Sequence, residues 1–301
     1  MKSIARQNRI AILVFILPAI LLYTILMVLP IFGSGYMSLL DWNGIGKAVM
    51  TGFSNYSHVF IQNYGDFWRT AINSFLFAIM CICIQLPLAL ILSLVISSGI
   101  KGEGFFRTTF FIPVVISGVA IGALFLKFYN YDFGLLNTIL DRLGLGSWKK
   151  VWLGDDRTAL LCAFLPLIWQ YIGYHMLLMY SAIKQVPAEV IESAKIDGAS
   201  RFQTSIRIII PLIVPMLEVC VIFAILGSLK ILDMIYVLTT NGMPDGITRV
   251  PSGYMILHMF QNQQVGIGST AAMFIVAECF IFTLLIRKVF HKLDYTIRTG
   301  A

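Results

Sequence analysis

The sequence contains few charged residues. Asp, Glu, Lys and Arg together make up 12% of the 301 residues, whereas hydrophobic residues make up 58% and the mean hydropathy is +0.84. Soluble domains carry roughly 25% charged residues, so the polar side chains of this chain would not cover its apolar ones adequately in water. The composition excludes an ordinary soluble globular protein and indicates a membrane protein.

The sequence also lacks the common motifs of nucleotide, metal and nucleophile sites. It has no G-x-x-x-x-G-K-[ST] string, and the nearest one, at residues 44–47, has the wrong spacing, which argues against ATP binding through a P-loop. It has no H-E-x-x-H, C-x-x-C or G-x-S-x-G, and its four histidines are scattered. The five cysteines lie in apolar stretches and are expected to be packing residues. We therefore predict no catalytic residue, no metal site and no cofactor bound by this chain.

Six apolar stretches are long enough to cross a membrane. A helix needs about 20 residues to cross ~30 Å of hydrocarbon, and continuous apolar runs favour helices over barrel strands. The first run is too long for the core of a signal peptide, so we expect an uncleaved span. The sequence predicts an all-α, polytopic membrane protein with six transmembrane helices, at about 10–32, 71–97, 108–128, 158–180, 208–229 and 268–287.

The distribution of Lys and Arg predicts the orientation. If the N-terminus is cytoplasmic, the inside segments hold 13 of the 22 basic residues, in agreement with the positive-inside rule. Both termini and the segment 181–207 are then cytoplasmic. The net charge of +7 is explained by contact with lipid of the inner leaflet, and no nucleic-acid partner is expected. The inside segments are 1–9, 98–107, 181–207 and 287–301.

Residues 186–215 form the longest polar, charge-bearing island between two apolar stretches. Pro187 suits a first helical position, and Gly198 suits the left-handed cap that ends a helix. Ser200 and Gln203 have the S-x-x-Q spacing of a capping box, which begins a second helix. The pattern predicts two short helices hinged at Gly198. A membrane protein that keeps such a segment at its surface is expected to dock a partner there.

Polar and aromatic residues within the apolar stretches are candidates for a substrate path. Aromatic rings stack on the C–H faces of a neutral polyol, while hydroxyl and amide groups bond its hydroxyls. Ordinary packing and interfacial tyrosines are the alternative for each residue. The candidates are Gln170, Tyr171 and Tyr174 in the fourth stretch, Gly227, Ser228 and Tyr236, which we group with the fifth, and Asp233 just past it.

Two other classes of protein remain open at this point. An ion-driven secondary transporter could use Glu218, Asp233 and Glu278 as a charge relay, because charges at membrane depth are costly and face helices or water. A membrane-embedded enzyme could use Ser or Asp residues at the bilayer surface. Neither class explains the island at 186–215.

Residues 192–211 resemble the EAA motif of permease subunits in ABC importers. ESAKIDG at 192–198 is followed, after nine residues, by IIIP at 208–211, and the family pattern is E-A-A, three residues, G, nine residues, I-x-L-P. Ser193 and Ile210 are mild departures. Further strings resemble the carbohydrate-uptake branch, of the maltose and glycerol-phosphate type. They are DGAS at 197–200, GFFR at 104–107 with IP at 112–113, FGLLN at 133–137, WLGD at 152–155 and NGMP at 241–244, while GIGS at 266–269 departs from the usual Gly-x-Ala.

The resemblance implies a type I importer permease fold and a sugar-transport function. The chain would form half of the translocation path for a mono- or oligosaccharide, with a polyol or glycerol phosphate as the alternative. Its partners would be a second homologous permease, two ATPase subunits and an extracellular or periplasmic solute-binding protein. ATP and Mg would bind the ATPase subunits, so the chain itself would not be an enzyme. Its location would be the cytoplasmic (inner) membrane of a bacterium or archaeon.

The resemblance also assigns roles along the chain. Coupling helices at 187–207 would insert into a cleft on one ATPase, and Tyr171, Tyr174, Gly227 and Ser228 match the mid-membrane lining of maltose-type relatives. The expected organisation is an N-terminal tail, first span and external loop at 1–70, a transmembrane core at 71–290 and a cytoplasmic tail at 291–301. The residues expected to couple to the ATPase are Glu192, Ser193, Ala194, Asp197, Gly198, Ala199 and Arg201.

Overall fold

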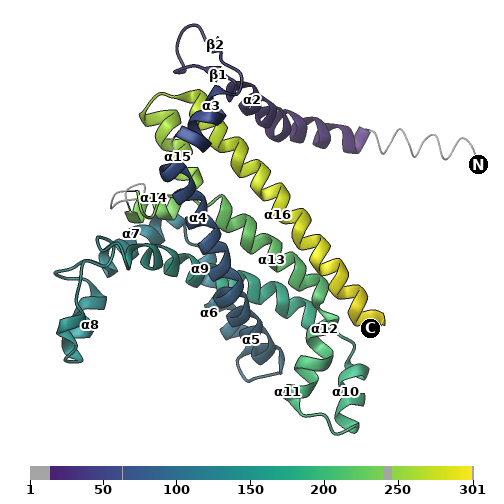
Figure 1. Cartoon of the computed structure of the whole chain (residues 1–301). Coiled ribbons are helices and arrows are strands. Elements are labelled where there is room, and N and C mark those ends of the chain that lie inside the picture. Colours follow the sequence, from purple (N-terminus) through teal and green to yellow (C-terminus); the bar gives the residue numbers. More distant parts are fainter. Residues whose placement is uncertain (1–13, 63, 240–245, 300–301) are drawn as a thin grey trace, which may run out of the picture. The chain divides into compact units, whose positions relative to one another are not determined.

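A computed structural model describes residues 14–62, 64–239 and 246–299 of the chain. Apart from a two-stranded ribbon, the regular structure of these residues is helical (Figure 1). The basic segment at 1–9, the turn string at 241–244 and the last two residues of the expected C-terminal tail lie outside the described residues. The chain divides into two compact units, one of residues 1–64 and 255–274 and one of residues 65–254 and 275–301.

Within the described part of the chain, four helices are long and apolar enough to cross a membrane. They are Val14–Met37, Gly65–Ser97, Ala159–Ile183 and Val265–Lys292. Two further stretches are bent pairs, with 94° between Glu103–Val115 and Gly118–Phe128 and 73° between Arg201–Leu212 and Val214–Leu229. The count reaches the predicted six if each bent pair is one span.

The stretches predicted as single spans at 108–128 and 208–229 are therefore bent in the structure. Ile116 has an extended backbone (φ −77°, ψ 136°), which ends one helix before Ser117 caps the next. Pro215 lies in the first turn of the helix that begins at Val214, where its missing N–H does no harm. An apolar sequence permits either a straight or a bent span, and contacts with neighbouring helices determine which one forms.

The first unit contains the N-terminal helix, a short hairpin and the start of the last helix. The N-terminal helix includes a π-helical turn η1 (Thr24–Val28) and α2 (Leu29–Met37). β1 (Leu40–Asp41) pairs antiparallel with β2 (Val49–Met50). α3 (Ser54–Ser57), η2 (His58–Gln62) and η6 (Leu257–Gln261) follow, and α15 (Pro251–Ile256) and α16 (Val265–Thr299) run through both units.

The hairpin is held against the start of α16 by backbone contacts. The Val265 N–H donates to the Trp42 carbonyl (2.9 Å), and Asn55 Nδ2 donates to the carbonyls of Ser38 (2.9 Å) and Leu40 (2.8 Å). A Cβ at Gly266 would lie 2.0 Å from the Leu40 carbonyl oxygen, so only glycine allows this approach. The last helix thus begins at Val265, three residues before the start that the sequence predicts.

The second unit is built around one long helix, α9 (Ala159–Ile183). It packs against α5 (Leu86–Ser97), α6 (Glu103–Val115) and α13 (Val214–Leu229). The remaining elements are α4 (Tyr64–Met80), η3 (Cys81–Gln85), α7 (Gly118–Phe128), α8 (Leu135–Arg142), η4 (Gly146–Trp148), α10 (Ala188–Ile196), α11 (Arg201–Thr204), η5 (Ser205–Ile209), α12 (Ile210–Leu212) and α14 (Asp233–Thr239).

Aromatic and small residues shape the core of this unit. Phe77 of α4 stacks on Phe164 of α9 with ring centroids 4.5 Å apart. A Cβ at Gly173 would lie 1.8 Å from the Phe110 carbonyl oxygen, so α6 and α9 touch backbone to backbone. The Gln170 amide donates to the Ile116 carbonyl (2.9 Å) and so satisfies a backbone group freed where α6 ends. Close packing of α9 therefore fixes the bend between α6 and α7.

The segment between α7 and α9 is organised by one buried asparagine. Asn137 Nδ2 donates to the carbonyls of Tyr131 (3.1 Å) and Lys150 (3.2 Å), and Trp152 Nε1 donates to Asn137 Oδ1 (2.8 Å). The backbone N–H of Arg157 donates to Asp155 and, with nearby Lys150, holds the pKa of the Asp155 carboxyl below its ordinary value. The segment between the two membrane helices is thus a folded element rather than an open loop.

Candidate functional site

Two short helices meet at a glycine at one end of the second unit. α10 ends in a Schellman motif, in which the Ala199 N–H donates to the Ala194 carbonyl (2.9 Å) and the Gly198 N–H to the Lys195 carbonyl (3.1 Å). Gly198 has φ +79°, the left-handed conformation that glycine adopts without strain. Figure 1 shows α10 and α11 side by side. The predicted end of the first helix is confirmed, although Pro187 is its N-cap residue rather than its first helical residue.

The second helix begins with the predicted capping box. The Gln203 N–H donates to Ser200 Oγ (3.2 Å), and the Ser200 N–H donates to Gln203 Oε1 (2.8 Å). The helix then continues through η5 and α12 to Leu212, where it bends into α13. We call residues 187–207 the coupling segment.

Apolar contacts fasten the coupling segment to the transmembrane helices. Ile183 at the end of α9, Ile209 of η5 and Ile213 form a buried cluster, against which Ile191 of α10 and Leu94 of α5 pack. The segment is thus tied to both α9 and α13. A displacement of α10 or α11 is expected to reach those helices because the contact between them is packed rather than flexible.

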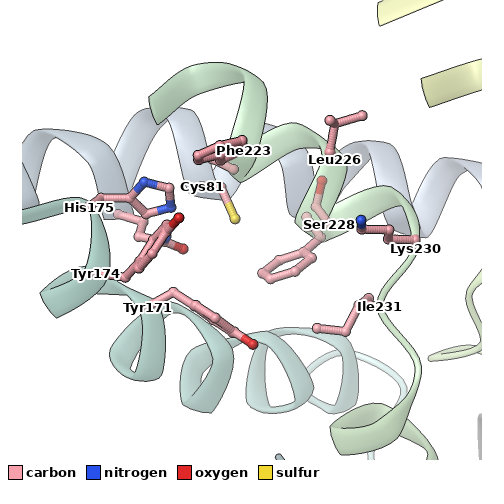
Figure 2. Close-up of a pocket in the computed structure, with 13 residues that line it drawn as sticks. Cys81, Tyr171, Tyr174, His175, Phe223, Leu226, Ser228, Lys230 and Ile231 are labelled. Carbon is pink, nitrogen blue, oxygen red and sulfur yellow. The ribbon is translucent and has the colours of Figure 1, made fainter. Parts of the chain in front are cut away.

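A cavity of about 340 Å³ lies between η3, α9 and α13. Figure 2 shows Tyr171, Tyr174 and His175 of α9 on one side, Phe223 and Ser228 of α13 on another, and Cys81 between them. Its lining is mostly aromatic and apolar with a few polar groups, as is usual for a site that binds a small molecule. The lining residues are Phe77, Cys81, Gln85, Tyr171, Tyr174, His175, Phe223, Ala224, Leu226, Gly227, Ser228, Lys230 and Ile231.

A second cavity, of about 270 Å³, adjoins the first. Tyr171, Gly227, Lys230 and Ile231 line both cavities. Gln170 and Asp233 line only the second one. Lys230 is common to the two linings, and no arginine is found among the described residues of either one.

The chain matches a known family along nearly its whole length. The family model of the inner membrane component of binding-protein-dependent transport systems matches residues 7–294. The chain belongs to this family.

Individual permeases are similar over most of their length. The chain is 32% identical to the probable ABC transporter permease protein YurN of Bacillus subtilis over 287 residues, which cover 94% of this chain and 97% of that one. It is 30% identical to the probable starch degradation products transport system permease protein AmyD of Thermoanaerobacterium thermosulfurigenes, with 88% and 89% covered. The trehalose/maltose transport system permease protein MalF of Thermococcus litoralis is 29% identical, with 91% of each chain covered.

A solved structure confirms the importer permease fold. A chain of a bacterial ABC transporter involved in the import of the acidic polysaccharide alginate superposes with a TM-score of 0.80 at 22% identity, and the match covers 97% of this permease and 98% of that chain. At 22% sequence identity, this similarity shows a shared fold and nothing about substrate.

The permease presents most of the predicted coupling residues at its surface. Ala194 is 6% exposed and supports the coupling segment from within, and Ala199 is half-buried. The exposed ones are Glu192, Ser193, Asp197, Gly198 and Arg201.

Two apolar residues of the coupling segment are absent from the set of coupling residues predicted from the sequence. Ile196 is 86% exposed and Phe202 is 74% exposed, one on each side of the Gly198 hinge. Large apolar side chains exposed on a polar segment often mark an interface. Both are large apolar residues close to Gly198 in an otherwise polar segment, and this feature of the sequence could have identified them.

The structure brings together most of the predicted path residues and separates one. Tyr171, Tyr174, Gly227 and Ser228 share the first cavity, and Gln170, Tyr171, Gly227 and Asp233 share the second. Tyr236 belongs to α14 rather than to the fifth span, and it is not among the residues of either lining. Its assignment to the fifth span is wrong because α13 ends at Leu229.

His175 and Gln85 also line the first cavity. The sequence did not point to His175, and for Gln85, a polar residue at membrane depth, it favoured hydrogen bonding between helices over a role in the path. His175 is buried, and its ring centroid lies 5.2 Å from that of Tyr174. Residues 171, 174 and 175 have the i, i+3, i+4 spacing of one helix face, and that spacing was the signal that could have identified His175. Among the described residues, no group of His, Cys, Asp and Glu could hold a metal ion.

Proposed function

We propose that this permease forms half of the path by which an uncharged mono- or oligosaccharide crosses the cytoplasmic membrane of a bacterium or archaeon. A solute-binding protein outside the membrane would deliver the sugar. Relatives named for starch degradation products and for trehalose and maltose support this substrate class. Rings of Tyr171 and Tyr174 suit the C–H faces of a sugar, and the absence of arginine from both linings argues against a phosphorylated one.

The observation that carries the proposal is the connection between the coupling segment and the cavity. α9 leads into α10, and α11 continues through α12 into α13. The two helices that line the cavity from opposite sides are therefore the two that flank the coupling segment in the chain. A force on that segment would tilt both walls of the cavity, which is what alternation between inward and outward access needs.

The source of the force would be an ATPase that the chain does not itself contain. Two ATPase subunits, with bound ATP and Mg, would sit on the cytoplasmic side, and a second homologous permease would complete the path. The exposed Ile196 and Phe202 would enter a cleft on one ATPase, with Glu192, Ser193 and Asp197 around them. Arg201 would support this contact from the start of α11, where its side chain lines a cavity behind the coupling segment. Ala194 and Ala199 would set the spacing of α10 and α11. In this orientation, both termini of the permease would lie in the cytoplasm.

The test is sugar uptake by the complete transporter in proteoliposomes. With the binding protein outside and ATP inside, labelled sugar should accumulate only when both permeases and the ATPase are present. Gly198→Pro and Glu192→Lys should abolish uptake while the complex still co-purifies. The first variant alters the hinge, and the second reverses the charge of the acidic residue that the family resemblance assigns to contact with the ATPase. Asp132→Lys is the charge-matched control, on the exposed segment between α7 and α8, and should keep uptake.

Two results would refute the proposal. One is uptake near the wild-type rate in the Gly198→Pro transporter. The other is uptake by the isolated permease under an ion gradient without ATP, which would favour a secondary transporter.

A further inference from the structure

A third cavity, of about 330 Å³, lies behind the coupling segment. The ends of α5 and α9 form one side of it, and α10 and α11 form the other. Ala188, Ile191 and Lys195 recur at i, i+3 and i+7 and so share one face of α10. The exposed Ile196 and Phe202 do not line it, so a partner that covers those two residues need not fill this space.

Of the residues that the structure describes, three basic side chains and no acidic one line this cavity. They are Lys184, Lys195 and Arg201. The Lys184 ammonium already has partners, since Nζ lies 3.3 Å from Glu103 Oε2 and 3.2 Å from the Ser97 carbonyl. Among the described residues, Lys195 and Arg201 take part in no ion pair. Two cations on opposite sides of the Gly198 hinge thus lack a counter-ion.

The rest of the lining is divided between apolar and hydroxyl side chains. Apolar side chains come from all four elements and their ends, and the hydroxyls belong to Ser97, Ser98, Thr204 and Ser205. This mixture suits an amphiphile with an anionic head better than a small hydrated ion. The apolar residues are Leu94, Ile183, Val186, Ala188, Ile191, Ala199 and Ile209.

We propose that this cavity binds the phosphate of an anionic phospholipid headgroup, with Lys195 and Arg201 as its ligands. The cavity lies where two helices that are apolar enough to cross a membrane, Gly65–Ser97 and Ala159–Ile183, come to an end, and lipid headgroups surround the ends of such helices. Arg binds phosphate through two parallel hydrogen bonds, and Lys binds it as a point charge. A free phosphate has the same chemistry but would leave the apolar part of the lining without a partner.

Such a lipid would restrain the hinge. Lys195 is on α10 and Arg201 begins α11, so one phosphate held by both fixes the angle between the two helices. Its release or exchange would then change how freely the coupling segment moves. The binding site stands without the proposed function, whereas its effect on transport rests on that function.

Binding is tested on the purified transporter complex by its thermal stability in nanodiscs. Phosphatidylglycerol should raise the melting temperature relative to phosphatidylcholine, and native mass spectrometry should detect retained phosphatidylglycerol. In the Lys195→Gln/Arg201→Gln transporter the apparent lipid affinity should fall about tenfold or more, because two charge-assisted bonds are lost. The single variant Lys195→Arg keeps the positive charge and should retain binding. Lys101→Gln removes the charge of an exposed residue outside the lining and should leave binding unchanged.

The remaining outcomes are separable. If inorganic phosphate in phosphatidylcholine nanodiscs reproduces the full shift, the lipid assignment is overturned and the ligand is a soluble phosphate. If the double variant responds to phosphatidylglycerol as the wild type does, the site itself is refuted. Both readouts are independent of sugar uptake, so failure of the transport proposal would not be mistaken for failure of this one.

Discussion

Two glycines of the second unit differ in what surrounds them. At Gly173 a Cβ would meet the Phe110 carbonyl oxygen at 1.8 Å, which no side chain can tolerate without backbone movement. At Gly227 a Cβ would meet no described atom within 4 Å beyond its chain neighbours and its own helix backbone, because the residue borders both cavities. The glycine at 173 thus allows two helices to pack closely, whereas the glycine at 227 leaves space in the cavities.

Gly173→Ala should destabilise the permease. The methyl group would force α6 and α9 apart, and overpacking of this kind costs about 1–3 kcal/mol. The melting temperature of the detergent-solubilised chain should fall, with Gly227→Ala as the matched control that leaves it unchanged. An unaltered melting temperature in Gly173→Ala would contradict the backbone contact between α6 and α9.

Gly227→Phe should reduce sugar uptake without lowering the stability of the permease. The ring would occupy the cavities and leave the helix contacts intact, so the complex should assemble with a melting temperature near that of the wild type. Uptake of a labelled oligosaccharide should fall more than uptake of a monosaccharide, because the larger solute needs more room. Equal uptake of both sugars at the wild-type rate would remove these cavities from the translocation path.

At the scale of elements, the bends between α6 and α7 and between α12 and α13 are the main departure from a simple bundle. A backbone group freed at a bend needs a partner, since lipid offers none. Gln170 provides one from the neighbouring α9, at 2.9 Å from the Ile116 carbonyl. The bend is therefore a property of the contact between helices and not of α6 alone.

Gln170→Leu should weaken this bend. The Ile116 carbonyl would lose its donor, at a cost of about 1–3 kcal/mol. Hydrogen exchange of the α6–α7 junction should become faster and the melting temperature should fall. Gln185→Leu is a suitable control, because the Gln185 amide donates to the Ser181 carbonyl at an exposed site. Identical behaviour of the two variants would mean that Gln170 does not hold the junction.

The ends of the coupling helices could be predicted from the sequence because they depend on local bonds. Ser200 and Gln203 cap a helix with each other, and the left-handed Gly198 needs only its own backbone. The bend at Ile116 and the contact at Gly173 depend on residues far away in the chain. No local pattern contains that information, so the positions of the spans were predicted and their shapes were not.

At the scale of the whole molecule, the permease is one part of a larger assembly. Its family is defined by transport that depends on a binding protein. The orientation in the membrane decides which partner meets which end, and so far it rests on the distribution of Lys and Arg.

Thiol labelling can establish this orientation. In a chain whose native cysteines have been replaced, Lys149→Cys should react with a membrane-impermeant maleimide in intact spheroplasts. Lys101→Cys, between α5 and α6, should react only after permeabilisation. Both residues lie outside the long apolar helices, and the bent pair Glu103–Val115 and Gly118–Phe128 separates them. If that pair is one span, the two variants report opposite sides of the membrane. The reverse labelling pattern would place the coupling segment outside the cell and exclude its contact with a cytoplasmic ATPase.

The length of α9 determines how large a movement the transporter requires. From Tyr171 to Ile183 the helix advances twelve residues, roughly 18 Å at ~1.5 Å per residue. A tilt of about 5° pivoting at Ile183 would carry Tyr171 by roughly 1.6 Å, within the ~1–2 Å range of helix shifts that switch other interfaces. Because α9 is one continuous helix, a small rotation at its Ile183 end is enough to produce a shift of this size beside the cavity, without any melting of secondary structure.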